Sequence, residues 1–461
     1  MRFKERFIGD RNFYKNLIFV VVPIIIQNAI TNFVSLLDNV MIGRIGTEQM
    51  SGVAIINQLL FVFNICVFGI TSAVGIFSAQ FYGAGDEKGV REAFRLKAIA
   101  SGIFAVLAIV IFSLLGGELV SLFLSDTGTG EDLNATLRYG LEYLHIMILQ
   151  IIPFSVVQVY YSTLRERGST LVPMICGTVS VGVNICLNAV LIYGLLGAPA
   201  LGVRGAAIAT LIARIAELII IVSWTHINRA KNPFIAGVYK SLYIPGKLIK
   251  NVIKTGTPLL LNEVLWSVGM TVLNQSYSTR GLQVIAGLNI SSTLSNLFNV
   301  VFISMGNAVG IIVGQQLGAG KLKQAKDTAR KIIFISLFVC ILVGAALMSV
   351  SSLFPMIYKT SDEVRSLATK FIIISSLFMP VAAFVNLSYF TMRSGGKTFI
   401  TFLFDSCFVW LISIPAVFVL TRYTQVGIVI IYFICQSLDI IKCVIGYVLL
   451  KKGIWINNLI K

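Results

Sequence analysis

A glycine-rich segment occurs twice in this chain at a fixed spacing. GIFSAQFYGAG, beginning at Gly75, recurs as GIIVGQQLGAG, beginning at Gly310, an offset of 235 residues. The same offset relates Pro23 in VVPIIIQNA to Pro258 in GTPLLLNEV. Two similar halves of one apolar chain are a feature of secondary transporters, in which the substrate site lies at the interface of the repeats. Transport is therefore the first hypothesis.

The chain is apolar almost throughout its 461 residues. Hydrophobic residues make up 56% and charged residues 12%, and the mean hydropathy is +0.87, which leaves too little polar surface for a soluble protein of this size. A spanning helix needs about 20 apolar residues, whereas the strands of a membrane barrel have about 10 of alternating polarity. Twelve continuous stretches meet the helical requirement: 16–41, 52–78, 93–116, 137–163, 170–194, 202–224, 254–277, 283–314, 330–354, 368–392, 398–420 and 425–450.

These stretches predict an all-α polytopic membrane protein with twelve transmembrane helices in two pseudo-symmetric six-helix lobes. The predicted bounds are 1–225 for the first lobe, 226–253 for a linker and 254–461 for the second lobe. The first stretch lacks a small-residue cleavage site, so we expect it to be retained rather than removed as a signal peptide.

The net charge of +17 is spread over loops and is not gathered on one soluble face, which argues against nucleic acid as a partner. Lys and Arg gather in the amino terminus, the 225–253 connection and the 321–331 loop. The intervening loops at 42–51, 195–203 and 278–282 are nearly free of them, and the 117–136 loop is acidic. The positive-inside rule then predicts that both termini are cytoplasmic, in a protein of the cytoplasmic (inner) membrane.

Acidic residues within apolar stretches are costly and mark functional sites by default. Asp38 lies fifteen residues after Pro23, and its repeat counterpart is the apolar Leu273. Glu263 lies five residues after Pro258, and its counterpart is Asn28. From the rise of about 1.5 Å per residue, Asp38 is roughly 5 Å inside the outer end of its helix, and Glu263 is roughly 14 Å from the inner end of its own. The two acids are therefore expected to serve separate sites.

Three polar residues are predicted at the level of Asp38. Asn184 and Asn188 are four residues apart and share one face of a helix, and Thr210 lies in the outer half of the next helix. A carboxylate with amide carbonyls and a hydroxyl suits a hard cation, or a carboxylate that exchanges a proton. If sodium is the ion, its predicted ligands are Asp38, Asn184 and Thr210. The alternative is that the asparagines and Thr210 only form hydrogen bonds between helices.

In the second half the acids gather toward the inner leaflet, where Asp405 and Asp439 join Glu263. Asp439 lies three residues before Lys442, and Arg214 lies three before Glu217, so each pair is predicted to form a local salt bridge. Glu263 has no charged partner at helical spacing and is the stronger candidate.

Other functional classes find little support in the sequence. The two GAG segments match no phosphate-binding loop, so they are interpreted as helix caps and turns, and ATP-driven transport is not expected. His145, His226 and the seven cysteines show no metal-ligand spacing, and no serine and histidine lie at matching depth. The chain is therefore predicted to be no enzyme and to need no cofactor.

Several segments, in order along the chain, together resemble the multidrug and toxic compound extrusion (MATE) family. They are the first helix with Asp38, the two GAG turns, STLRERGST at 162–170, the region 184–210 and RSGGKT at 393–398. The resemblance implies export of organic cations against an influx of sodium ions or protons.

The resemblance also implies roles for individual residues. Asp38 matches the family's cation-responsive acid in the first helix, its companions fall on Asn184, Asn188 and Thr210, and Glu263 matches an acid in the seventh helix. Many relatives have Asp where this chain has Asn188, which leaves the choice of ion open. The family's tenth-helix Asp is missing, because that stretch has only Asn386 at depth. Either Asp405 replaces it, or the site of that lobe is not used.

Together these inferences predict a monomeric antiporter in the lipid bilayer, exporting organic cations and drug-like compounds in exchange for sodium or protons. The main alternative is a flippase for lipid-linked oligosaccharides from the same superfamily. Its phosphate-bearing cargo calls for several basic residues at depth, whereas only Arg214 and Lys442 lie well inside a predicted span. A receptor or channel could line a pore with polar helices, but the twofold repeat has no obvious selectivity filter, which disfavours that class.

Overall fold

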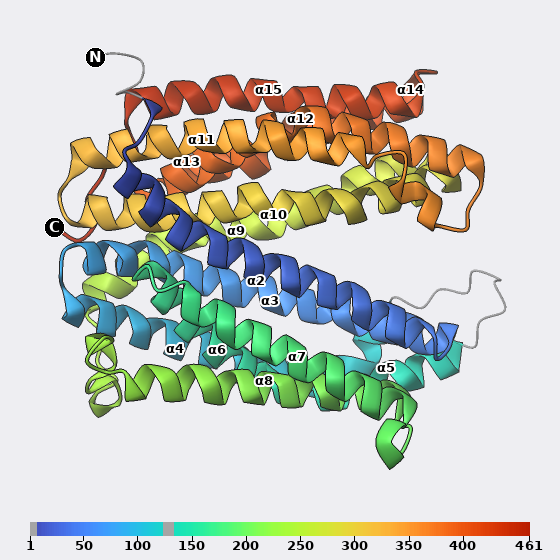
Figure 1. Ribbon diagram of the computed structural model, residues 1–461, viewed down its shortest axis with the longest axis horizontal. Coiled ribbons are helices and arrows are strands. Elements are labelled where there is room, and N and C mark those ends of the chain that lie inside the picture. The colour runs from blue at the N-terminus through green and yellow to red at the C-terminus, as the bar shows by residue number, and fades with distance from the viewer. Residues whose placement is uncertain (1–6, 123–132) are drawn as a thin grey trace. The chain divides into compact units, whose positions relative to one another are not determined.

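The computed structural model describes residues 7–122 and 133–461, without the side chains of residues 35, 36, 39, 40 and 47. Part of the basic amino terminus (Arg2, Lys4 and Arg6) and part of the acidic 117–136 loop (Asp126, Glu131 and Asp132) lie outside the described residues. Within the described ranges the chain is helical and contains no strand (Figure 1).

Each apolar stretch of the first half forms a helix, as predicted. The 137–163 stretch consists of two α-helices joined by a short 3-10 turn, Ile148–Gln150. The bounds are α2 Arg11–Gly43, α3 Thr47–Gly83, α4 Glu87–Ser121, α5 Leu133–Met147, α6 Ile151–Glu166, α7 Leu171–Tyr193 and α8 Gly202–Ile227.

The second half repeats this arrangement. The 398–420 stretch is divided into α13 and α14 by two π-helical segments, Leu403–Cys407 and Val409–Ser413. The bounds are α9 Gly246–Ser278, α10 Leu282–Gly318, α11 Leu322–Ser349, α12 Asp362–Ser394, α13 Thr398–Phe402, α14 Ile414–Tyr423 and α15 Ile428–Lys452.

Eleven helical stretches of the described residues are long and apolar enough to cross a membrane. The twelfth predicted span, α9, is not among them because Pro258, Asn262 and Glu263 make its middle more polar. Its 33 residues still exceed the roughly 20 that a membrane crossing requires. The protein is therefore an all-α polytopic membrane protein with the twelve predicted helices.

The chain divides into two compact units. One comprises Ile26–Ser78 and Asp86–Lys250, and will be called the Asp38 unit. The other comprises Met1–Ile25, Ala79–Gly85 and Asn251–Lys461, and will be called the Glu263 unit. These units are defined by packing, whereas the predicted lobes are defined by the repeat, and the lobe bounds stay a prediction.

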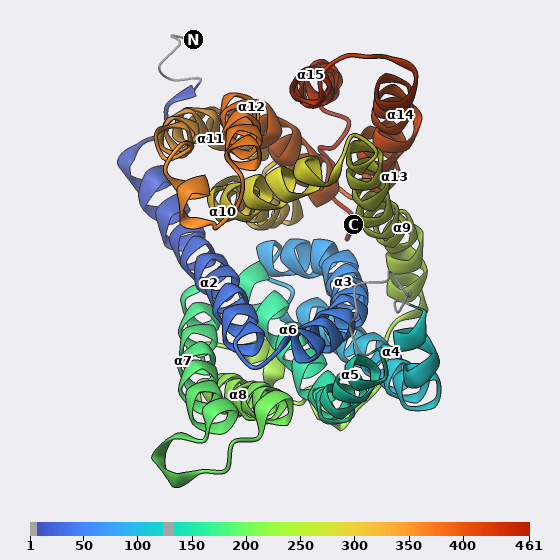
Figure 2. The ribbon, with the colours of Figure 1, turned by 90° about the vertical axis from the view of Figure 1, so that its right-hand side faces the viewer.

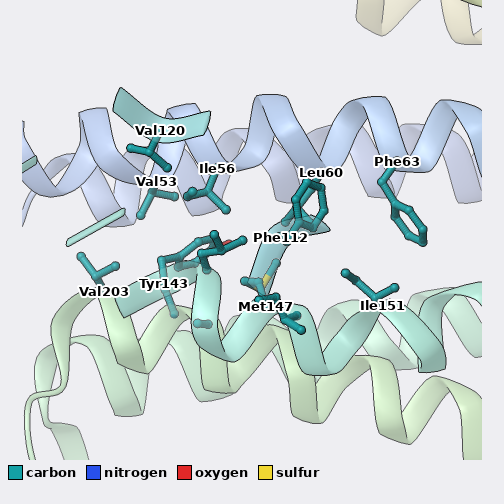
Figure 3. Packing of buried hydrophobic residues seen from close by; sticks show 14 of the residues in the cluster. Val53, Ile56, Leu60, Phe63, Phe112, Val120, Tyr143, Met147, Ile151 and Val203 are labelled. Atoms are coloured by element: carbon teal, nitrogen blue, oxygen red, sulfur yellow. The ribbon is translucent and has the colours of Figure 1, made fainter. Parts of the chain in front are cut away.

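The core of the Asp38 unit forms where α3 faces α4, α5, α6 and α8 (Figure 3). Small residues on α8 let it approach α7 closely, since a Cβ atom on Gly205 would collide with the backbone of Leu191. Figure 3 labels ten core residues: Val53, Ile56, Leu60, Phe63, Phe112, Val120, Tyr143, Met147, Ile151 and Val203.

In the Glu263 unit, α12 packs against α10, α11 and α15 (Figures 1 and 2). Gly306 on α10 and Gly344 on α11 permit this approach, because a side chain on either glycine would collide with α12. These contacts pack α12, which carries Asn386, Tyr389 and Arg393, closely against α10, α11 and α15.

The GAG segments cap helices, as predicted. Gly85 and Gly320 follow α3 and α10 with φ angles of +76° and +73°, which glycine adopts at low cost. Gln80, in the first of these segments, is completely buried. Its amide donates to the carbonyls of Ser394 at 3.1 Å and Asn457 at 3.2 Å and accepts from the amide of Leu459 at 2.7 Å. This part of the motif therefore holds the carboxy-terminal segment in place.

Candidate functional site

Asp38 is joined to the polar face of α7 in the Asp38 unit. Its Oδ1 accepts a hydrogen bond from Nδ2 of Asn188 at 2.7 Å. The same Nδ2 donates to Oδ1 of Asn184 at 3.1 Å, one helical turn away. The structure therefore brings Asp38 to the face of α7 on which the two asparagines were predicted to lie.

The chain of hydrogen bonds continues onto α8. Nδ2 of Asn184 donates to Oγ1 of Thr210 at 3.2 Å, and that hydroxyl donates to the carbonyl of Ala206 at 3.0 Å. Tyr143 on α5 is buried, at 4% exposed, and interacts electrostatically with Thr210 and Asp38. Tyr143 was missed in the sequence, because its position in α5 is that of an ordinary core aromatic.

One oxygen of this cluster has no hydrogen-bond partner within the described part of the chain. Nδ2 of Asn188 donates to both Asp38 and Asn184. Its Oδ1 is buried and accepts no hydrogen bond from the described residues. Asn188 as a whole is 1% exposed. A buried acceptor without a donor costs about 1–3 kcal/mol, which a bound cation would offset. The donor set of a carboxylate, amide oxygens and a hydroxyl fits a hard cation.

A second charged cluster of the Asp38 unit lies toward the end of α6. Nζ of Lys97 contacts Oε2 of Glu166 at 2.5 Å and the hydroxyls of Ser162 and Thr163 at 3.0 and 3.2 Å. The Lys97 side chain is 0% exposed. Gly75 of the repeated motif makes room for this carboxylate, since a Cβ atom there would collide with Oε1 of Glu166. Spacing along the chain could not predict this pair, because Lys97 lies on α4 and Glu166 on α6.

The predicted salt bridge between Arg214 and Glu217 is present, with a distance of 2.7 Å. Glu217 also accepts a hydrogen bond from the hydroxyl of Tyr161 at 2.5 Å. Arg165 donates to Oε1 of Gln27 at 2.6 Å. Basic side chains at depth in this unit thus have polar or acidic partners.

In the Glu263 unit, Glu263 has partners on α12. Its Oε1 accepts a hydrogen bond from the hydroxyl of Tyr389 at 3.2 Å, and Arg393 lies near enough to attract it electrostatically. Asn386 is not part of this contact, since its Oδ1 lies against Gly306 without a hydrogen-bond partner among the described residues.

Asp405 lies in the first π-helical segment and belongs to the same cluster. Its Oδ1 accepts from Nζ of Lys442 at 2.9 Å, and its Oδ2 accepts from Nδ2 of Asn262 at 3.2 Å. Asn262 also donates to the hydroxyl of Tyr389 at 3.3 Å, which links Asp405 to Glu263.

Lys442 is closer to Asp405 than to Asp439, from which it is 3.9 Å away. The predicted local pair of Asp439 and Lys442 is therefore the longer of two contacts. The sequence did not reveal Asn262 and Tyr389, whose partners are more than a hundred residues away along the chain. In the described ranges no three His, Cys, Asp or Glu residues are grouped to hold a metal ion.

Solved structures share this fold over nearly the whole chain. An Asp-to-Asn mutant of the Vibrio cholerae MATE transporter VcmN has a TM-score of 0.86 at 18% identity, covering 97% of this chain and 98% of that one. A MOP superfamily transporter from Pyrococcus furiosus, whose binding pocket is described as having reverse polarity, has a TM-score of 0.83 at 18% identity and 97% coverage of both chains.

Two relatives match this chain over most of its length. The probable multidrug resistance protein NorM of Thermotoga maritima is 25% identical, covering 90% of this chain and 87% of the relative. The probable multidrug resistance protein YoeA of Bacillus subtilis is 24% identical, covering 90% and 88%.

The repeat is also visible in the family match. The MatE family matches two separate segments, residues 23–190 and 258–419, one in each half of the chain. The first contains Asp38, Asn184 and Asn188, and the second contains Glu263 and Asp405. Since the two segments cover most of the sequence, the chain belongs to the MatE family of membrane transporters.

Proposed function

We propose that this protein is a cation-coupled secondary antiporter that exports organic cations and drug-like compounds across the cytoplasmic membrane. The relatives named above as probable multidrug resistance proteins support drug efflux. The positive-inside pattern supports cytoplasmic termini. The observation that carries the proposal is the contact of Asp38 with Asn188, whose buried oxygen has no donor among the described residues.

Coupling requires that the two cargoes exclude each other. The organic cation and the coupling ion compete for the negative charge of Asp38, so binding of one releases the other. Each species then shifts the conformational equilibrium by its difference in affinity for the two states. If sodium is the coupling ion, Asp38, Asn184 and Thr210 supply oxygen ligands, with the free oxygen of Asn188 beside them. If a proton is the coupling ion, Asp38 carries it.

Replacing Asn188 with alanine tests the cluster around Asp38. This variant removes a donor to Asp38 and an acceptor facing the site, so we expect affinity for the coupling ion to fall about tenfold, corresponding to roughly 1.4 kcal/mol. Efflux measured against ion concentration should show a higher half-saturation point. Thr178→Ala on α7 is the control, because Thr178 is exposed and bonds only its own helix. An unchanged ion dependence in Asn188→Ala would remove the residue from the site.

Glu263→Gln is expected to weaken coupling more than it lowers expression. The variant removes the negative charge at the Tyr389 contact but keeps a side chain of similar shape. The rate of drug efflux driven by a fixed ion gradient should therefore fall several-fold, while the amount of protein in the membrane stays similar. Glu363→Gln, at the exposed start of α12, is the control. If ion dependence and efflux of Glu263→Gln match those of the wild type, Glu263 has no role in coupling.

Proteoliposomes separate the two coupling ions. Efflux of a fluorescent organic cation is measured under a sodium gradient alone and under a proton gradient alone, with the membrane potential clamped. The proposal predicts transport under at least one gradient and none without a gradient. Equal transport in all three conditions would describe a uniporter or channel and would contradict antiport.

The flippase alternative finds less support in the side-chain contacts. More basic side chains lie at depth than the two predicted, since Lys97 is completely buried. Lys97, Arg214 and Lys442 are however each paired with an acid, at 2.5, 2.7 and 2.9 Å. Paired cations offer little charge to a phosphate-bearing cargo, so the antiporter remains the preferred function.

A further inference from the structure

The connection between α8 and α9 is a folded cap at the start of α4, within the Asp38 unit. Arg91 donates to the carbonyls of Phe234 and Pro233 at 3.1 and 3.2 Å. Arg95 donates to those of Val238 and Gly237 at 2.7 and 2.9 Å. The side chains of Phe234 and Val238 are buried beneath this backbone. The connection therefore has a defined shape, which a flexible linker would lack.

This cap lines an open pocket of about 460 Å³. An aromatic pair forms one wall, since the rings of His226 and Tyr239 are stacked with centroids 5.8 Å apart. Tyr160 fixes both rings, because its hydroxyl is hydrogen-bonded to Nε2 of His226 at 3.1 Å and to the hydroxyl of Tyr239 at 2.5 Å. Arg229 and Lys240 complete the polar lining.

The two cations of the pocket are not neutralised. Neither Arg229 nor Lys240 makes an ion pair with an acid within the described ranges. The connecting residues 226–253 contain five Lys or Arg residues, Arg229, Lys231, Lys240, Lys247 and Lys250, and no Asp or Glu. The pocket thus presents uncompensated positive charge, which favours an anionic ligand.

Exposed apolar and aromatic side chains lie close in sequence to the two cations. Ile227, Leu242 and Tyr243 are 79%, 74% and 69% exposed, and Tyr239 is 65% exposed. Ile227 is the last residue of α8, a candidate membrane span, and Leu242 and Tyr243 follow Lys240 of the pocket by two and three residues. We therefore expect this part of the chain to lie near the lipid headgroups. Exposed aromatic residues beside Lys and Arg are typical of that interface. A soluble anion would contact the cations but would leave these apolar side chains uncovered.

We propose that the pocket formed by His226, Arg229, Tyr239 and Lys240 binds the phosphate headgroup of an anionic membrane lipid. Arg229 and Lys240 bind the phosphate, and the acyl chains lie along Leu242 and Tyr243. Basic pockets at the membrane surface attract anionic lipid headgroups. The ligand class follows from charge and position, and it is independent of the transported substrate.

Lipid binding to the purified full-length protein tests this site. Native mass spectrometry in mixed micelles measures the binding of phosphatidylglycerol and of phosphatidylcholine. The double variant Arg229→Ala/Lys240→Ala should bind phosphatidylglycerol about tenfold more weakly, with phosphatidylcholine binding unchanged. The matched control, Lys247→Ala/Lys250→Ala, loses the same charge from exposed positions outside the pocket, and should change less than about twofold.

Two further measurements distinguish the remaining outcomes. Arg229→Lys/Lys240→Arg retains both charges and should retain binding, which separates lost recognition from misfolding. Inorganic phosphate at the concentration of the lipid should not displace phosphatidylglycerol from the wild type. The proposal is overturned if both alanine pairs lose binding equally, if neither does, or if inorganic phosphate displaces the lipid.

Discussion

Replacing Asp38 with asparagine should reduce ion-driven efflux about a hundredfold or more while the protein remains folded in the membrane. The substitution keeps the size of the side chain and one oxygen that can accept from Asn188, but it removes the negative charge for which the two cargoes compete. Because a neutral amide does not discriminate between loaded and unloaded states, the ion gradient can no longer drive the conformational change. Efflux from vesicles with an imposed gradient measures the effect.

The control for this variant is Asp362→Asn. Asp362 lies in the first turn of α12 and its side chain is 97% exposed, so loss of its charge should leave efflux unchanged. Expression and the elution profile of the purified protein should be similar for both variants and the wild type. Normal gradient-driven efflux by Asp38→Asn would overturn the role assigned to Asp38.

The second large effect is a loss of folding stability when the buried ion pair of Lys97 and Glu166 is broken. Lys97→Met or Glu166→Gln should each lower the free energy of unfolding by about 3–5 kcal/mol, because each leaves a buried charge without its partner. The double variant should lose much less than the sum of the two, since it leaves no charge uncompensated. Unfolding of the purified protein in detergent, monitored by circular dichroism, provides the measurement.

A pair on α4 with one exposed partner provides the comparison. Lys88 and Glu92 are 4.0 Å apart, and the Lys88 side chain is 82% exposed. The corresponding variants, Lys88→Met and Glu92→Gln, should each change stability by less than about 1 kcal/mol. Strictly additive losses at Lys97 and Glu166 would show that the two charges do not depend on each other.

The polar cluster around Asp38 was predictable because the depth of each residue along its helix, and the spacing within α7, relate its parts. The four-residue spacing of Asn184 and Asn188 places both on one face, and counting residues from the helix ends places Thr210 at the depth of Asp38. The structure joins all four by hydrogen bonds. Tyr143 could not be recognised, because its contact depends on how α5 packs and not on spacing within one helix.

The site around Glu263 was less predictable, because it depends on the packing of α9, α12 and the π-helical segment. Spacing within one helix favoured Asp439 as the partner of Lys442, but the structure places Asp405 a full ångström closer, at 2.9 Å against 3.9 Å. A π-helical turn changes the direction of the side chains that follow it, and an α-helical wheel does not describe this. Asp405 therefore belongs to the cluster around Glu263, and its own charge is paired with Lys442.

The structure of the linker, residues 226–253, could not be predicted from its sequence. Its composition predicted a basic connection, and the folded cap was not expected. The structure creates the cap through Arg91 and Arg95 on α4, whose guanidinium groups bind carbonyls more than a hundred residues away. Backbone carbonyls carry no sequence signal, so contacts of this kind cannot be derived from residue types.

Competition at Asp38 is tested most directly by measuring the affinity of the purified protein for a fluorescent organic cation while sodium concentration and pH are varied separately. For the wild type, we predict that affinity falls as sodium concentration rises or as pH is lowered, according to the coupling ion. For Asp38→Asn, affinity should be weak and independent of both. If the affinity of the wild type stays constant across both titrations, the proposed exchange of cations at Asp38 is contradicted.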